Sequence, residues 1–171
     1  LNNENLGLLA SGQPRFVPAT PLGVQTLINE IDTKLEGSNV VIIGRSKLVG
    51  IPLALLLSSK SSTGNATVTI CHSKSKDIKA HTKNADIVIV ATGFPHTLQK
   101  DMVKKDSIVI DVGVNRIEDP SKKNGFRLIG DSDFDEIIEI VSKITPVPGG
   151  VGPMTIAMLL SNTLLACKNN D

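Results

Sequence analysis

A glycine-containing turn at residues 44–50, with the sequence GRSKLVG, has residue types and spacing that suit phosphate binding. It follows an apolar run and leads into a helix-like segment, and the free N–H groups at the start of such a helix bind pyrophosphate. The turn departs from G-x-G-x-x-G because Arg45 and Ser46 stand in the middle. Arginine can bind phosphate oxygens with paired N–H donors, and serine can donate its hydroxyl. We therefore predict that Gly44, Arg45 and Ser46 bind dinucleotide phosphates; the alternative is an ordinary turn with a solvated arginine.

The residues that follow the second apolar run favour one dinucleotide over another. His72, Ser73 and Lys74 come directly after this run, and the first carboxylate is Asp77. In NAD-binding sheets an acidic residue at this position accepts from the ribose 2′-hydroxyl, whereas neutral or basic groups accommodate a 2′-phosphate. Together with Arg45, this pattern predicts NADP rather than NAD. The alternative is a half-exposed histidine at a strand end with solvated lysines beside it.

Two further strand-like runs end in small residues on the side where open α/β sheets bind ligands. They are followed by ATG at 91–93 and by DVGVN at 111–115. Gly93 and Gly113 would let a cofactor lie against bare backbone. Asp111 is interpreted as a structural cap or turn residue, because nothing near it in sequence makes it a good general base.

The segment TPVPGGVGPMT at 145–155 combines three prolines with three glycines. Proline stiffens a backbone and glycine permits close approach, so a rigid loop with few side chains that leads into a helix suits the wall of a ligand site. A connecting loop without a ligand is the alternative.

The sequence shows no obvious general base, nucleophile or metal site. His81 and His96 have no Cys, Asp or Glu at metal-ligand spacing, and there is no Ser-His-Asp pattern or nucleophile elbow. Cys71 and Cys167 lie far apart and are expected to be buried thiols in a reducing compartment. We therefore predict no bound metal.

The composition argues against nucleic acid and membrane as partners. The 171 residues include 18 Lys plus Arg and 17 Asp plus Glu, for a formal net charge of +1, so no electrostatic footprint for either surface is present. Trp and Tyr are absent and Phe occurs four times, which leaves few rings to stack on bases. No window approaches the roughly 18 consecutive apolar residues of a membrane span.

Short apolar runs that alternate with helix-like segments predict the fold. β-branched runs suit strands that are buried on both faces, and their alternation with helices indicates a parallel sheet with right-handed crossovers. We predict an α/β chain with a Rossmann-like, doubly wound, mainly parallel sheet and helices on both faces. The expected strands are 39–43, 66–71, 86–91 and 107–112, and the expected helices are 21–36, 49–57, 77–84, 133–143 and 154–168.

One domain is expected over residues 20–171, preceded by a polar, irregular linker over 1–19. The segment DPSKKNG at 119–125 is expected to be a surface loop or hairpin excursion, and the last helix to return towards the first segment. Because the sequence begins at Leu1 rather than Met, we interpret it as a piece of a longer protein.

Six motifs, in this order, make the sequence resemble the bifunctional methylenetetrahydrofolate dehydrogenase/cyclohydrolase family. The resemblance covers nearly the whole chain, and the joint occurrence of the motifs makes chance implausible. The motifs are TPLG at 20–23, GRSKLVGIP at 44–52, TVTICHS at 67–73, ADIVIVATG at 85–93, IDVGVN at 110–115 and TPVPGGVGPMT at 145–155.

The resemblance implies two reactions. Hydride would pass from 5,10-methylenetetrahydrofolate to NADP, and water would open the methenyl product to 10-formyltetrahydrofolate. Gly44, Arg45 and Ser46 would hold the cofactor phosphates, Ser73 with Arg45 would hold the 2′-phosphate, and the backbone around Val114 would border the nicotinamide. The residues implied to line the folate site are Pro148, Gly149, Gly150, Val151 and Gly152.

The resemblance also implies that the catalytic residues lie outside this chain. The family's catalytic lysine and tyrosine, and an aspartate that contacts the pterin, belong to an N-terminal domain that would end just before Leu1. The expected partners are therefore the folate substrate, that missing N-terminal domain of the same polypeptide and a second copy in a homodimer. A cytoplasmic location is expected.

Two alternatives from other classes stay open at this stage. One is a stand-alone dinucleotide-binding module used for regulation or assembly. The other is the cofactor half of another two-domain Rossmann oxidoreductase, such as a shikimate-dehydrogenase-like enzyme. A Tyr-x-x-x-Lys helix upstream would favour the folate enzyme over both.

Overall fold

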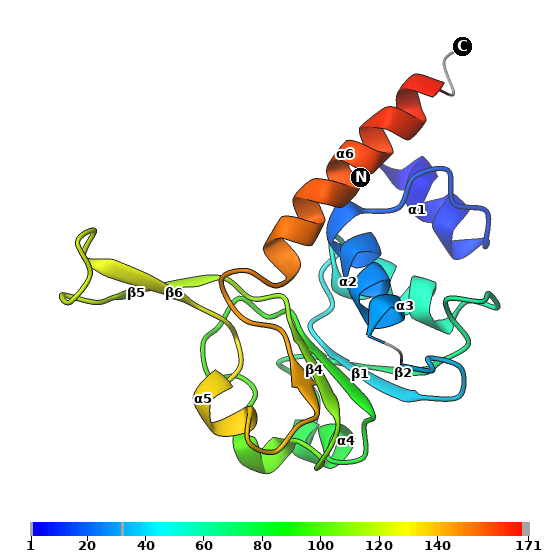
Figure 1. Cartoon of the computed structure of the whole chain (residues 1–171). Helices are drawn as coiled ribbons and strands as arrows, with labels where there is room; N and C mark the ends of the chain where they lie inside the picture. The colour runs from blue at the N-terminus through cyan, green and yellow to red at the C-terminus, as the bar shows by residue number, and fades with distance from the viewer. Residues whose placement is uncertain (1, 32, 169–171) are drawn as a thin grey trace.

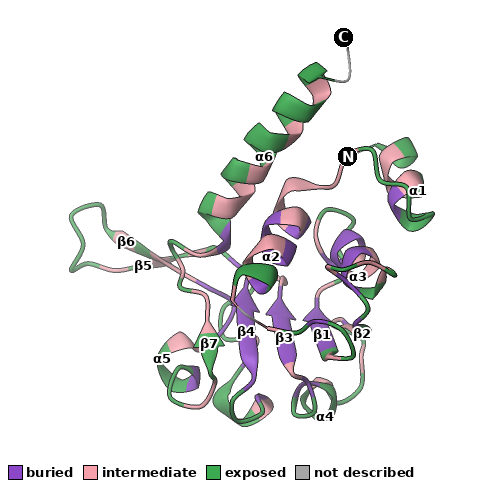
Figure 2. Ribbon diagram, turned by 45° about the vertical axis from the view of Figure 1, so that its right-hand side comes forward, coloured by how far each residue is buried: buried purple, intermediate pink, exposed green. Residues whose placement is uncertain are grey.

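The computed structural model describes residues 2–31 and 33–168. Its centre is a five-stranded sheet in which all neighbours are parallel (Figure 1). The strand order is β2-β1-β3-β4-β7 (Figure 2). The strands are β1 (Asn39–Ile43), β2 (Thr67–Cys71), β3 (Ile87–Val90), β4 (Ile108–Asp111) and β7 (Lys143–Ile144). The first four agree with the predicted strands to within one residue at each end, and the predicted α/β class is confirmed.

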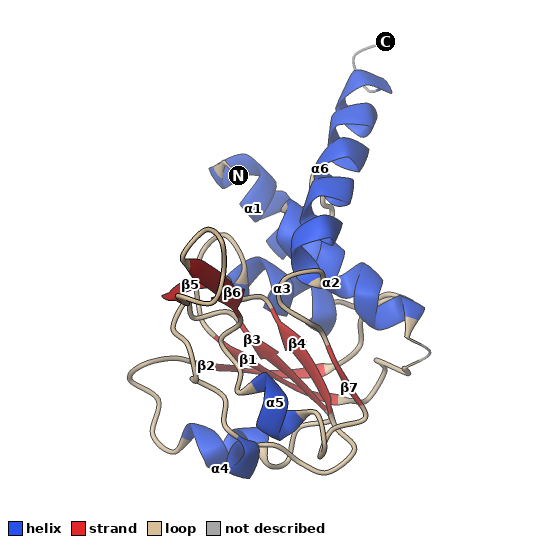
Figure 3. Cartoon of the chain, turned by 60° about the vertical axis from the view of Figure 1, so that its left-hand side comes forward, coloured by secondary structure: helices blue, strands red, loops and turns tan. Residues whose placement is uncertain are grey.

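Helices cover both faces of the sheet, as predicted (Figure 3). One face carries α2 (Ala19–Glu30), α3 (Gly50–Ser58) and the first turn of α6 (Val151–Lys168), and the other carries α4 (Ile78–Thr82), the 3₁₀ helix η1 (Lys100–Met102) and α5 (Phe134–Ile137).

Each central strand contributes to two hydrophobic cores, because successive side chains point to opposite faces. In β1, Val40 and Ile42 pack towards α2 and α3, whereas Val41 and Ile43 pack towards the opposite helical layer. Figure 2 shows β3 and β4 buried along their length, and β1 buried after its exposed first residue. Leu53 of α3 is 0% exposed, and full burial of such a side chain contributes about 1.5–3 kcal/mol.

The order in which strands are added to the sheet reverses at β1. From β1 it passes through α3 to β2 on one side, and from β2 it returns through α4 to β3 on the other side. The carboxyl ends of β1 and β3 therefore border the place where the crossovers diverge, and open α/β sheets bind their ligands in the crevice at such a point.

The prediction of an irregular segment over 1–19 is wrong for its first part, because Asn3–Ala10 form the helix α1. The Asn2 side chain caps this helix by accepting from the Asn5 N–H at 2.9 Å. Leu9 is buried and α1 lies against α3, so tertiary packing stabilises a helix that its polar sequence did not indicate. The next helix is also shorter than predicted, since α2 ends at Glu30.

Two predictions for the C-terminal part are also wrong. The expected helix over 133–143 is only the single turn α5, and Lys143–Ile144 instead extend the sheet as β7 beside β4. The last helix begins at Val151 rather than at 154. Proline is tolerated in the first turn of a helix, because N–H groups there have no intrahelical acceptor. Pro153 is therefore compatible with a helix that starts at Val151.

The two cysteines differ in environment. Cys71 is buried as predicted, and burial raises the pKa of its thiol. Cys167 lies exposed on α6, so the prediction of a second buried thiol is wrong.

An antiparallel ribbon of β5 (Asn115–Glu118) and β6 (Phe126–Ile129) projects from the sheet (Figure 1). The predicted excursion over 119–125 is the turn that joins these strands, which confirms the hairpin. The Arg116 guanidinium lies 3.6 Å from the centre of the Phe126 ring, a cation–π contact on the ribbon surface.

Candidate functional site

The predicted phosphate turn lies at the divergence of the crossovers, directly after β1. Gly44 has φ +127°, and its N–H donates to the Cys71 carbonyl oxygen at 2.8 Å. A Cβ on Gly44 would lie 2.2 Å from the Ala91 carbonyl oxygen. Only glycine permits both this backbone conformation and this close approach to the end of β3, so the residue type brings the turn against two neighbouring strands.

Ser46 organises the start of α3. Its hydroxyl oxygen accepts from the N–H groups of Val49 at 3.0 Å and Gly50 at 3.4 Å. Because the oxygen accepts both bonds, the hydroxyl proton remains available to donate to an anion. In the described part of the chain, the N–H groups of residues 45–48 donate no hydrogen bond. The turn thus combines unsatisfied N–H donors with the positive end of a helix dipole.

The end of β2 forms the opposite wall of the same cleft. A cavity of about 410 Å³ is lined by Arg45 and Ser46 from the first turn, by His72 and Ser73 after β2, and by Thr92 after β3. His72 Nδ1 accepts from the Lys74 N–H at 3.1 Å, so in the neutral ring the proton is on Nε2. The structure therefore brings together the residues predicted for the phosphates and for the 2′-phosphate.

A second cleft of about 330 Å³ lies at the end of β4. It is lined by the turn 111–114, the segment 146–153 and Ile156 of α6. Val114 is 60% exposed, whereas Val151 is 3% exposed and belongs to the core. The structure thus places Val114 and the stretch from Pro148 to Gly152 around one cleft.

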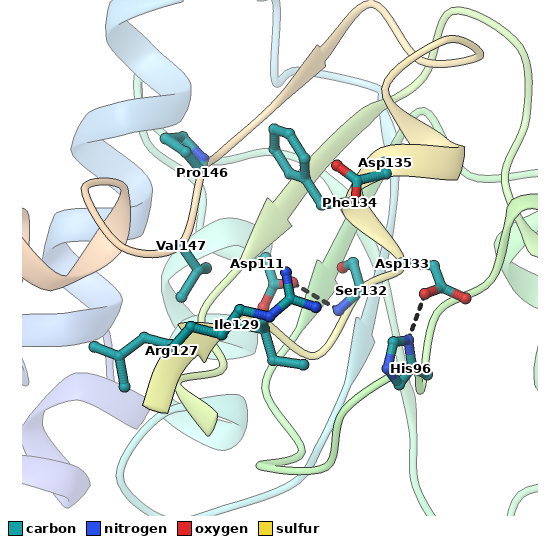
Figure 4. A pocket seen from close by; sticks show the side chains of 12 residues that line it. His96, Asp111, Arg127, Ile129, Ser132, Asp133, Phe134, Asp135, Pro146 and Val147 are labelled. Carbon is teal, nitrogen blue, oxygen red and sulfur yellow. Dashed lines mark hydrogen bonds and ion pairs between the residues drawn. The ribbon is translucent and has the colours of Figure 1, made fainter. Parts of the chain in front are cut away.

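Asp111 also lines this second cleft and makes internal hydrogen bonds, of which Figure 4 shows the one with Ser132. Its carboxylate is 3% exposed and accepts from the N–H groups of Gly113, Asp131 and Ser132 at 2.9, 3.0 and 2.7 Å. Burial raises the pKa of the Asp111 carboxyl, while these N–H donors act in the opposite direction. This environment agrees with the interpretation of Asp111 as a turn residue.

Sequence reasoning missed Asp131, which is also fully buried. No spacing pattern marks it, since its hydrogen-bond partners are up to 39 residues away in the chain.

A smaller cavity of about 210 Å³ was missed as well; there His96 contacts the Asp133 carboxylate (Figure 4). Among the residues that the structure describes, no three His, Cys, Asp or Glu side chains are grouped to hold a metal ion.

The fold and the first cleft together define a class. The class is a Rossmann-like dinucleotide-binding domain. Its features here are the strand order of the parallel sheet, the glycine turn where the crossovers diverge, and a basic side chain facing the end of the second strand.

Comparison with known proteins identifies the family. The model of the tetrahydrofolate dehydrogenase/cyclohydrolase NAD(P)-binding domain matches residues 18–171. The bifunctional protein FolD of Salinibacter ruber is 52% identical over 165 residues, which cover 96% of this chain and 55% of the relative. The chain therefore belongs to the tetrahydrofolate dehydrogenase/cyclohydrolase family, and it spans about half the length of the curated relatives it matches.

Solved structures agree with this membership. The bifunctional FolD dehydrogenase/cyclohydrolase of Campylobacter jejuni has a TM-score of 0.89 and 47% identity, and the match covers 99% of this chain and 57% of that one. The Trypanosoma brucei enzyme, solved with NADP and an inhibitor, has a TM-score of 0.90 and 39% identity, with the same coverage of 99% and 57%. Membership in this family disagrees with the alternative of a shikimate-dehydrogenase-like cofactor half.

Proposed function

We propose that this chain is the NADP-binding half of an enzyme that oxidises 5,10-methylenetetrahydrofolate to 5,10-methenyltetrahydrofolate and hydrolyses that product to 10-formyltetrahydrofolate. The observation that carries the proposal is the turn of Gly44, Arg45 and Ser46 at the head of a 410 Å³ cleft, in a chain 52% identical to a bifunctional relative. When bound, NADP supplies the hydride acceptor. The chain supplies binding and orientation.

The phosphate contacts follow from the geometry of the first cleft. Gly44 opens the turn, Ser46 offers its hydroxyl proton, and the N–H groups of 45–48 offer further donors. The exposed Arg45 side chain and Ser73 line the same cavity from opposite walls. A phosphate on the ribose at the end of β2 would therefore meet a cation and a hydroxyl, whereas the ribose hydroxyl of NAD finds no carboxylate there.

The second cleft is proposed to hold the nicotinamide end and the folate. Val114 forms one wall, and the residues from Pro148 to Gly152 form the other. Glycine and proline leave this wall free of long side chains, so a flat ring can lie against it. Both buried carboxylates beneath it, Asp111 and Asp131, accept internal hydrogen bonds. We accordingly assign no catalytic residue to this chain and place the reacting groups in the half that it lacks.

Calorimetric titration of the chain with NADP, and separately with NAD, tests the cofactor assignment. We expect NADP to bind at least about tenfold more tightly, because a charge-assisted contact to the 2′-phosphate contributes roughly 1.5–3 kcal/mol. Tighter binding of NAD would contradict the proposed role of Arg45 and Ser73, and no binding of either would contradict the proposal as a whole. Methylenetetrahydrofolate oxidation after the N-terminal half is restored tests the folate assignment.

The exposed face of α6 is proposed as the contact surface for that N-terminal half. The helix extends from the domain beyond its contact with α2 (Figure 1). By length and composition it could cross a bilayer, with a mean hydropathy of 1.2, and 6% of its residues are buried inside the described chain; one such helix is weak evidence for a membrane span. Four leucines on it are 41–66% exposed: Leu159, Leu160, Leu164 and Leu165. Such a stripe beside a binding cleft fits a missing part of the same polypeptide, since the relatives are nearly twice as long.

Replacing Leu160 and Leu164 together by lysine is expected to decrease self-association of the isolated chain and leave its NADP affinity unchanged. The leucines are on the exposed apolar stripe and do not line either cleft. Sedimentation velocity measures the association and calorimetry the affinity. Ser161→Lys, on the same helix but without loss of an apolar side chain, is the control. Equal association of the double variant and the unmodified chain would argue against this surface.

A homodimer and a cytoplasmic location belong to the same proposal. Within the described residues, the β5–β6 ribbon pairs with no other strand, so both of its outer edges can accept a strand from a second copy. The main sheet also ends in the short edge strand β7. A second copy would therefore find unpaired backbone groups on this side of the domain.

A further inference from the structure

Asp131 is a carboxylate that lies completely inside the protein, in the connection between β6 and α5. It is 0% exposed. Its Oδ2 accepts from the Thr92 N–H at 2.7 Å, the Gly93 N–H at 2.8 Å and the Thr92 hydroxyl at 2.9 Å. Its Oδ1 accepts from Asn115 Nδ2 at 2.8 Å. Three of these donors meet Oδ2 and one meets Oδ1, so hydrogen bonds from protein groups satisfy both oxygens of the buried carboxylate.

The bonds to Oδ2 orient one wall of the first cleft. In a planar trans peptide the N–H and the carbonyl point in opposite directions. Because the N–H groups of Thr92 and Gly93 point at Asp131, the carbonyls of Ala91 and Thr92 point away from it. The Ala91 carbonyl oxygen does face Gly44, whose Cβ position lies 2.2 Å from it. Asp131 thus contacts the loop after β3, and that loop in turn packs against the phosphate turn.

The contacts of Oδ1 orient a wall of the second cleft. Asn115 Nδ2 donates both to Asp131 and to the Gly130 carbonyl oxygen, at 2.8 and 3.0 Å. A Cβ on Gly113 would lie 2.0 Å from Asp131 Oδ1, so the backbone just before Val114 packs directly on the carboxylate. One side chain therefore contacts the turns that follow both β3 and β4.

The burial of this charge has an energetic consequence. Removing a carboxylate from water is costly, and the charge is tolerated only where several donors compensate for the lost solvent. Here the donors come from two separate turns of the ligand-binding edge. Any movement of one turn relative to the other would leave a buried charge without its full set of donors, so the carboxylate opposes that movement.

We propose that Asp131 is the positioning residue that holds the loop 91–93 and the turn 112–115 at a constant separation. NADP spans both clefts under the proposed function, on which this inference rests. Asp131 then sets the affinity for NADP and the geometry of hydride transfer through these two turns, without contacting cofactor or substrate.

Asp131→Asn in the native full-length polypeptide tests the proposal. The change preserves the shape but replaces an acceptor oxygen by an N–H donor that faces other donors. We expect NADP affinity to fall roughly 30-fold, since bonds to a charged acceptor contribute about tenfold or more each. The ratio of dehydrogenase to cyclohydrolase rates, measured in one sample, is expected to fall at least about tenfold. This ratio does not depend on the fraction of folded protein.

Asp86→Asn is the matched control. Asp86 also accepts from a backbone N–H, that of Asn39 at 2.9 Å, and from Lys104 Nζ at 2.7 Å, but it precedes β3 at the amino-terminal edge of the sheet. We expect Asp86→Asn to lower stability and leave the activity ratio unchanged.

Asn115→Ala is a milder second variant that keeps the Asp131 carboxylate and removes one of its donors. The NADP affinity of this variant is expected to fall about fivefold.

The outcomes separate the inference from the function it rests on. If the unmodified enzyme binds NADP and neither variant changes the affinity or the ratio, Asp131 does not position the cofactor. If both activities fall in parallel, its role is only structural and the proposal is wrong. If the unmodified enzyme does not bind NADP, the proposed function itself fails, and this inference fails with it.

Discussion

Arg45→Ala is expected to weaken NADP binding about 100-fold and NAD binding far less, because an arginine on phosphate makes paired, charge-assisted hydrogen bonds of roughly 1.5–3 kcal/mol. Arg45 is exposed at the rim of the cleft that Ser73 lines from the other side. Among the described residues its guanidinium makes no ion pair with a carboxylate. The full charge is therefore available to a ligand.

Calorimetric titration of the variant with both dinucleotides measures this difference. Lys47→Ala removes a positive charge from the same turn, but Lys47 does not line the cleft. It is expected to weaken NADP binding less than about threefold, through long-range attraction alone. An equal loss in both variants would mean that the turn acts through its general charge. An equal loss of NAD and NADP affinity in Arg45→Ala would mean that the side chain binds the shared pyrophosphate rather than the 2′-phosphate.

Gly44→Ala is expected to destabilise the chain by about 4 kcal/mol and to abolish cofactor binding. Two costs of roughly 1–3 kcal/mol each add: a backbone conformation that only glycine adopts readily, and overpacking. Gly44 has φ +127° and would place its Cβ 2.2 Å from the Ala91 carbonyl oxygen. That oxygen follows the central strand β3, which is buried on both faces and cannot shift to make room.

Urea-induced unfolding, followed by circular dichroism, measures the loss. Gly12 gives the matched control because its φ is +77° and a Cβ there would meet nothing within 4 Å. Gly12→Ala is therefore expected to cost only about 1 kcal/mol, from the backbone conformation alone. If the two variants were equally stable, the close approach of Gly44 to β3 would not be the reason for the glycine.

The C-terminal part shows why an apolar pattern alone can mislead. The prediction of a helix over 133–143 rested on Phe134, Ile137, Ile138 and Val141, whose spacing fits one face of a helix. Of these, Ile137 and Val141 pack against the second core. The structure instead ends the helix after one turn, because Ile144 can extend the sheet beside Val109 of β4. Pairing with a neighbour that lies 35 residues earlier in the sequence overrides local spacing.

The parallel sheet, the place of the phosphate turn and the family all follow from local sequence patterns. Short β-branched runs can be buried on both faces only as central strands, and a turn after the first of these must lie where the crossovers diverge. Gly44, Arg45 and Ser46 are neighbours in the chain, so their grouping needed no tertiary information.

The contacts that join the ligand-binding turns to each other arise from long-range packing and have no local sequence signal. Asp131 contacts Thr92 and Asn115 from positions 39 and 16 residues away, and Asp111 reaches Ser132 across 21 residues. Such contacts depend on where the whole chain returns after the β5–β6 ribbon. Hydrogen bonds require approach to about 3 Å, and no local propensity of either segment determines that distance.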